Sequence, residues 1–139
     1  MSPESSLSSP SAPRDSRALK GKRGLQRILN ACRYSVDGLR SAWTEEDAFR
    51  QELLLAAILV PLAIMLPFNL IERLLLIGSV FLVLIVELVN TAIESTVDRH
   101  SFEINPLAKR AKDLGSAAVM LSLVLAGTVW ACILWSRFG

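Results

Sequence analysis

The chain has 139 residues, of which 52% are hydrophobic and 20% are charged, and its formal net charge at pH 7 is +2. The hydrophobic residues are gathered in long blocks rather than spread along the chain. Blocks of this length exclude a soluble globular domain and predict a small protein that crosses a membrane several times.

The N-terminal segment is rich in Ser and Pro, and it contains no apolar run of the kind that marks a signal peptide. A segment with so little apolar surface cannot bury enough of it to fold. We therefore expect a disordered leader over residues 1–23, followed by a membrane domain over residues 24–139.

The first helical pattern follows the leader, with apolar residues at steps of three and four between Leu25 and Trp43. Arg27, Arg33 and Arg40 lie among its polar positions. The pattern predicts an amphipathic helix over about residues 25–50, which carries too much charge to cross a bilayer and is expected at the membrane surface. A helix packed on the cytoplasmic side would show the same pattern and remains an alternative.

Three apolar segments are predicted to cross the membrane as helices, over about residues 51–68, 72–95 and 113–136. A crossing needs roughly 20 residues, which the second and third segments supply. The first segment is short and contains Pro61. Membrane helices tolerate proline where neighbouring helices satisfy the freed backbone groups. The predicted fold is therefore all-α, with three membrane helices and one surface helix.

The distribution of basic residues predicts the orientation. Every Lys and Arg except Arg73 and Arg137 lies within residues 14–50 or 94–113. Because Lys and Arg are enriched on the cytoplasmic side, the N-terminus and the connection between the second and third membrane helices are expected there. The C-terminus is expected on the opposite side.

The second membrane segment ends in the motif "VELVNTAIESTVDR", residues 86–99, which carries Glu87, Asn90 and Glu94. On a helix these three residues share one face at the cytoplasmic end of the segment. Acidic residues are rare inside membranes and usually functional. Three interpretations compete: a hydrogen-bonded packing residue, a proton-coupled carboxylate of a transporter, or phosphoryl transfer with one carboxylate as base and another as Mg²⁺ ligand.

Further polar residues near the same predicted face favour phosphoryl transfer. Glu46 precedes the first membrane segment, and Lys112 and Asp113 precede the third. Lys112 could pair with phosphate, and Arg27 of the surface helix could hold an anion. The sequence contains neither a Walker A motif nor the Gly-rich loop of protein kinases, so a nucleotide site would have to be built in another way.

The motif, with its Glu-x-x-Asn-[Ser/Thr]-Ala-Ile-Glu core, resembles the signature of the prokaryotic diacylglycerol kinase family. The resemblance extends from about Gly24 to the C-terminus through "YSVDGLRSAW", "EEDAFRQE", "RAKDLGSAAV" and "WSRFG". It is greatest with the proteobacterial branch, which phosphorylates diacylglycerol. The Gram-positive relatives prefer undecaprenol.

The resemblance implies an integral enzyme of the bacterial inner membrane that uses ATP and Mg²⁺ to convert diacylglycerol to phosphatidate. It also implies a homotrimer of three-span protomers, with active sites between protomers at the cytoplasmic face and a periplasmic C-terminus. An undecaprenol kinase of the same family and a small proton-coupled transporter remain the alternatives. A nucleic-acid partner is not expected.

The resemblance also assigns residues to roles. It makes Glu87 the general base and Asn90 a residue needed for catalysis, with Glu46 and Glu94 as the metal ligands. The implied ATP-binding residues are Arg27, Tyr34, Glu46, Glu94, Glu103, Asn105, Lys112 and Asp113. The implied lipid-binding residues are Arg27, Ser35, Arg50, Glu52, Glu87 and Ser116.

Overall fold

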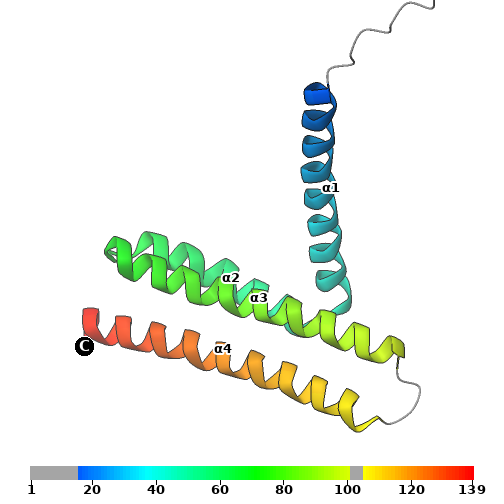
Figure 1. Ribbon diagram of the computed structural model, residues 1–139. Coiled ribbons are helices and arrows are strands. Elements are labelled where there is room, and N and C mark those ends of the chain that lie inside the picture. Colours follow the sequence, from blue (N-terminus) through cyan, green and yellow to red (C-terminus); the bar gives the residue numbers. More distant parts are fainter. Residues whose placement is uncertain (1–15, 101–104) are drawn as a thin grey trace, which may run out of the picture. The chain divides into compact units, whose positions relative to one another are not determined.

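The computed structural model describes residues 16–100 and 105–139, which form four helices and, within those ranges, no strand (Figure 1). The helices are α1 (Ser16–Glu45), α2 (Asp47–Met65), α3 (Leu70–His100) and α4 (Pro106–Phe138). This confirms the prediction of an all-helical chain. Residues 1–15 of the expected leader lie outside the described residues, and α1 begins at Ser16, inside the segment that composition assigned to the leader.

The break between the first two helices falls at Glu46, earlier than the boundary near residue 50 that the hydrophobic pattern predicted. Glu46 has extended backbone angles, with φ −112° and ψ 112°, and occupies the N-cap position of α2. The charged residues around this break look like a continuation of the surface helix when only their polarity is considered. The backbone angles at Glu46, which polarity does not reveal, end that helix.

The described residues divide into two units, with the boundary between Gly38 and Leu39. In the described part of the first unit, α1 carries exposed apolar side chains, including Leu25, Ile28, Leu29 and Val36. They lie at the three- and four-residue steps that predicted an amphipathic helix. Its location at a membrane surface stays a prediction.

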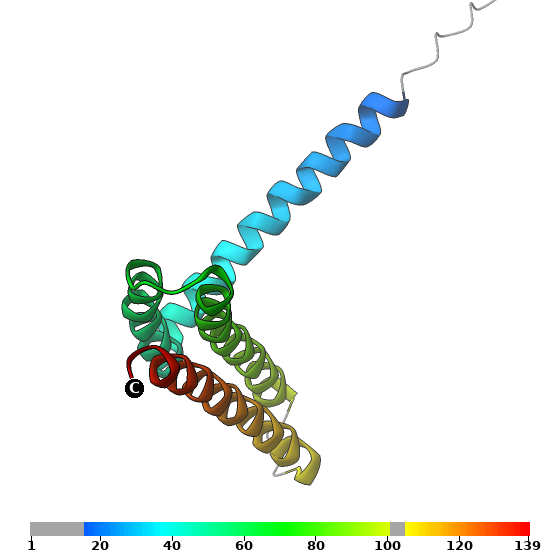
Figure 2. The ribbon, with the colours of Figure 1, turned by 90° about the vertical axis from the view of Figure 1, so that its left-hand side faces the viewer.

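Among the described residues, three helices of the second unit are long and apolar enough to cross a membrane, in agreement with the three predicted segments. α3 packs against both α2 and α4 (Figures 1 and 2). The core contains small residues from α2, such as Ala56 and Ala63, together with Leu76 of α3 and Trp130 of α4. Many large side chains on the same helices are exposed, as expected where the surroundings are lipid or another protein chain.

Helix α3 begins at a reciprocal cap. The amide of Asn69 donates to Glu72 Oε2 at 2.8 Å, and the amide of Glu72 donates to Asn69 Oδ1 at 2.9 Å. An amide side chain followed three residues later by Glu forms such a capping box, which satisfies two backbone donors that the helix itself leaves unpaired. The cap therefore fixes where the chain turns from α2 into α3.

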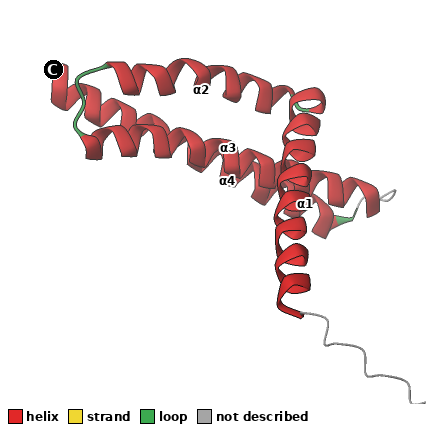
Figure 3. Ribbon diagram, turned by 90° about the horizontal axis from the view of Figure 1, so that it is seen from above, coloured by secondary structure: helices red, strands yellow, loops and turns green. Residues whose placement is uncertain are grey.

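The same turn is held by Arg73 and Arg137, the two basic residues outside the predicted cytoplasmic segments. Arg73 donates, at 3.2 to 3.4 Å, to the carbonyl oxygens of Ala63, Leu66 and Phe68. Arg137, near the end of α4, donates through Nε to the carbonyl oxygen of Pro67 at 3.1 Å. Figure 3 shows the C-terminal end of the chain beside the turn that connects α2 to α3. These carbonyls lie in the last turn of α2 or in the turn that follows it, so both arginines have a structural reason to lie at this end of the bundle.

Candidate active site

Glu87, Asn90 and Glu94 lie on one face of α3, as predicted, and form a polar stripe whose first two residues are buried. Glu87 is 4% exposed and Asn90 is 8% exposed, while Glu94, one turn further on, is half-buried. Among the described side chains Glu87 is the one ionisable group that is buried. Burying a carboxylate in an apolar bundle costs free energy unless a partner compensates, which argues for a functional role.

The side-chain amide of Asn90 links two residues of the stripe, Asn90 itself and Glu94. Its Nδ2 donates to Glu94 Oε1 at 3.4 Å. Its Oδ1 is buried and, among the described residues, has no hydrogen-bond partner. The Asn90 amide therefore holds one carboxylate of the stripe directly and keeps an acceptor free inside the bundle.

Two more carboxylates from the α2 side approach Glu87. Glu46 and Glu94 both interact electrostatically with Glu87, and Glu52 of α2 does so as well. Glu52 Oε2 is buried with no hydrogen-bond partner among the described residues. Like charges repel strongly where water is excluded, so a cluster of this kind requires protons or a cation.

The donor set fits Mg²⁺ that arrives with a nucleotide better than a resident metal ion. Within the described ranges, no three His, Cys, Asp or Glu side chains are grouped so that they could hold one ion by themselves. Mg²⁺ typically takes one or two protein carboxylates and completes its octahedron with phosphate oxygens and water. Glu46 and Glu94 could supply those carboxylates.

Lys112 of α4 lies beside the C-terminal end of this stripe. Its Nζ donates to Asp98 Oδ1 at 2.8 Å and so joins α4 to α3. Asp98 follows Glu94 by four residues and Glu87 by eleven, which places it on the same face of α3. The stripe is thus longer than the sequence motif predicted, and it ends in an ion pair with the lysine expected to bind phosphate.

Comparison with known proteins identifies the family. Residues 33–134 match the family model described as prokaryotic diacylglycerol kinase. The chain belongs to the prokaryotic diacylglycerol kinase family. The diacylglycerol kinase of Escherichia coli (strain K12) is 49% identical over 116 residues, which cover 84% of this chain and 95% of the relative. That of Pseudomonas aeruginosa is 51% identical over 115 residues, 83% and 94% of the two chains, and that of Haemophilus influenzae is 47% identical over 112 residues, 81% and 95%.

Membership of the diacylglycerol kinase family confirms the resemblance drawn from the motif and the prediction of an enzyme. A kinase of this family uses ATP, and the three apolar helices agree with a membrane location. The transporter interpretation is therefore set aside, while the role of Glu87 in the reaction stays a prediction.

The remaining residues predicted to bind ligands in this kinase are distributed over several elements. Arg27, Tyr34 and Ser35 are exposed on α1, where Ser35 Oγ donates to the carbonyl oxygen of Ala31 at 3.0 Å. These residues belong to the first unit, and their roles stay predictions.

Asn105 is the N-cap of α4, and its Oδ1 accepts a hydrogen bond from the Leu107 amide at 2.9 Å. Asp113 and Ser116 are exposed on α4. Glu103 lies outside the described residues. For Asn105, capping already explains the side chain, because Asn at this position satisfies a backbone donor.

Arg50 joins the end of α1 to the start of α2. Its Nη1 donates to the carbonyl oxygens of Trp43 and Thr44, both at 3.1 Å, and its Nη2 pairs with Asp47. These bonds give the guanidinium a structural role in the kinase. The role of Arg50 in lipid binding stays a prediction.

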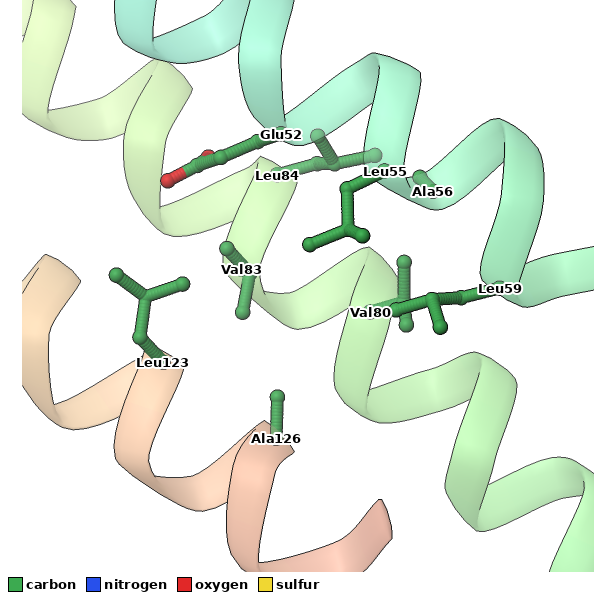
Figure 4. A pocket seen from close by; sticks show the side chains of 9 residues that line it. All are labelled: Glu52, Leu55, Ala56, Leu59, Val80, Val83, Leu84, Leu123 and Ala126. Atoms are coloured by element: carbon green, nitrogen blue, oxygen red, sulfur yellow. The ribbon is translucent and has the colours of Figure 1, made fainter.

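An apolar pocket lies between α2, α3 and α4, with Glu52 at one end (Figure 4). Leucine, valine and alanine side chains form the rest of its lining, among them Leu55, Leu59, Val83 and Leu123. A pocket of this chemistry accepts hydrocarbon, while the carboxylate supplies a polar group at one end. The sequence motif did not predict it, because it takes residues from three separate helices.

Proposed function

We propose that this protein transfers the γ-phosphoryl group of ATP to the primary hydroxyl of diacylglycerol and so forms phosphatidate. The observation that carries the proposal is a buried glutamate, Glu87, in the C-terminal half of the apolar helix α3 in a member of a lipid kinase family. A general base of this kind has to meet a substrate hydroxyl that arrives from the membrane.

In the proposed reaction Glu87 accepts the proton of the lipid hydroxyl as the hydroxyl oxygen attacks the γ-phosphorus of ATP. The bond between the γ-phosphorus and the oxygen that bridges it to the β-phosphate breaks, and ADP leaves. Lys112 pairs with phosphate oxygens and stabilises their charge. Asn90 holds Glu94 in place through the hydrogen bond from its amide.

Glu46 and Glu94 would bind Mg²⁺, which neutralises the negative charge of the ATP phosphates when it is bound. The electrostatic interaction of Glu87 with both Glu46 and Glu94 supports this assignment, since a cation held by these two residues would relieve the repulsion between the carboxylates. The further nucleotide contacts that we propose come from Arg27, Tyr34, Glu103, Asn105 and Asp113.

On the lipid side, the apolar pocket beside Glu52 supports a hydrocarbon substrate. We assign further lipid contacts to Arg27, Ser35, Arg50 and Ser116. A bound acyl chain in the pocket would hold the glycerol end toward the cluster that contains Glu87, because Glu52 both lines the pocket and interacts with Glu87.

The proposed setting is the cytoplasmic face of the bacterial inner membrane, with α1 on the membrane surface and the C-terminus on the periplasmic side. The placement of all basic residues but Arg73 and Arg137 supports this orientation. The proposed assembly is a homotrimer. Large apolar side chains left exposed on α2, α3 and α4 provide surface for neighbouring protomers as well as for lipid.

The test is phosphorylation by the purified protein in detergent micelles, with ATP and Mg²⁺ and with diacylglycerol or undecaprenol offered in parallel. The proposal predicts that diacylglycerol is phosphorylated faster at equal mole fraction in the micelle. Faster phosphorylation of undecaprenol would support phosphoryl transfer from ATP but would make undecaprenol the preferred substrate. Phosphorylation of neither lipid would refute the proposed function.

A further inference from the structure

A glycine on α4 lies directly against the amide of Asn90. Gly115 is buried, and a Cβ atom added to it would lie 3.3 Å from Asn90 Cγ and in steric conflict with Asn90 Oδ1. Gly78 of α3 and Gly127 of α4 have no such neighbour within 4 Å among the described residues. The close approach at Gly115 is therefore particular to this point of the bundle.

The position of the Asn90 amide depends on the space that the missing side chain of Gly115 leaves open. On one side the amide donates to Glu94 Oε1 at 3.4 Å, and on the other its oxygen fills the place that a side chain at position 115 would occupy. A larger residue there would force the Asn90 side chain to rotate. Because the hydrogen bond to Glu94 is already at the long end of the accepted range, a small rotation would break it.

We infer that Gly115 is a positioning residue for phosphoryl transfer: by lacking a side chain, it allows the Asn90 amide to lie between α3 and α4 and to hold Glu94. The inference rests on the proposed function, in which Asn90 and Glu94 serve catalysis. Gly115 itself touches no substrate and acts through Asn90.

A simpler role for Gly115 would be to let two helix backbones pack closely. The contacts distinguish the two roles. The nearest main-chain atom of α3 to the added Cβ is Asn90 Cα at 4.0 Å, which is an ordinary contact distance. The conflict therefore comes from the Asn90 side chain, and removing that side chain should remove the conflict.

The experiment is a double-mutant cycle on the full-length protein, with Gly115→Ala, Asn90→Ala and both together. Gly127→Ala on the same helix is the matched control. Alanine is a better helix former than glycine, so Gly127→Ala should leave the midpoint of thermal unfolding unchanged or raise it. Gly115→Ala should lower the midpoint when Asn90 is present and should not lower it when residue 90 is alanine.

Activity gives the second measurement. Gly115→Ala should lower kcat at least tenfold and raise the Mg²⁺ concentration needed for half-maximal rate, since Glu94 loses the bond from Asn90, whereas Gly127→Ala should change neither. An equal loss of thermal stability from Gly115→Ala in both backgrounds would overturn the inference. So would wild-type turnover and Mg²⁺ dependence in Gly115→Ala.

The cycle separates failure of this inference from failure of the proposed function. Normal turnover in Asn90→Ala would remove Asn90 from the proposed mechanism, and with it the role of Gly115 in catalysis. A slow Asn90→Ala beside a fully active Gly115→Ala would overturn only the inference. If Gly115→Ala does not assemble, recovery of assembly in the double variant supports the inference, and failure of both variants overturns it.

Discussion

Replacing Glu87 by Gln should separate catalysis from stability, because the two depend on opposite properties of this carboxylate. Gln has nearly the same volume, so packing around the buried position is kept. The amide cannot take a proton from the lipid hydroxyl. General-base catalysis contributes about 10²–10⁴-fold to rate, and kcat should fall by that factor.

The stability of the same variant should not fall. Glu87 interacts electrostatically with the carboxylates of Glu46, Glu52 and Glu94, and a neutral side chain at position 87 removes its repulsion with them. The midpoint of thermal unfolding of Glu87→Gln is therefore expected to equal or exceed that of the wild type. A folded, assembled protein with almost no turnover is the predicted combination.

The assay is initial-rate phosphorylation of diacylglycerol in micelles, with thermal unfolding and size-exclusion chromatography on the same preparations. Glu72→Gln is the matched control on α3, because Glu72 belongs to the capping box at the other end of the helix and Gln can replace Glu in that motif. It should keep full activity. A Glu87→Gln protein with more than about a hundredth of the wild-type kcat would refute the reasoning, since the lower bound for a general base is about 10²-fold.

Three further predictions concern the proposed metal ligands, the ion pair between Lys112 and Asp98, and Arg73 at the turn between α2 and α3. Replacing Glu46 or Glu94 by Gln should raise the Mg²⁺ concentration needed for half-maximal rate; an unchanged Mg²⁺ titration in both variants would remove their role as ligands. Lys112→Ala should raise KM for ATP more than it lowers kcat, and Asp98→Asn should lower KM for ATP, because Asp98 competes with phosphate for the lysine; a raised KM in Asp98→Asn would contradict that competition. Arg73→Ala should cost about 1.5–3 kcal/mol of stability through its carbonyl bonds while kcat stays within about twofold, as measured by denaturant unfolding beside the rate assay.

Much of the fold follows from the sequence, because length and apolarity decide whether a helix can cross a membrane. The number of candidate spans was predictable on that basis, and the shared face of Glu87, Asn90 and Glu94 was predictable from their spacing on a helix. The helix boundary at Glu46 was not, since it depends on backbone angles that the polar pattern does not reveal.

The contacts between helices could not be predicted from the sequence. Asp98 could have been found, because it continues the spacing of the acidic stripe, but only its pairing with Lys112 across the α3–α4 contact gives it a role. Gly115 carries no signal in the sequence, since a glycine near the start of a membrane helix has many explanations. Its importance depends on which side chain of α3 lies opposite, and that is a property of the packed helices.

The most direct test of the central claim is to follow the label from ATP radiolabelled in its γ-phosphate. The purified protein would be placed in vesicles that contain diacylglycerol, with Mg²⁺ present. If the stripe at the end of α3 is where lipid and nucleotide meet, label will appear in phosphatidate in equal amount to the ADP formed, and Glu87→Gln will nearly abolish both. ADP formed without labelled lipid, or label transfer that survives Glu87→Gln, would contradict the claim.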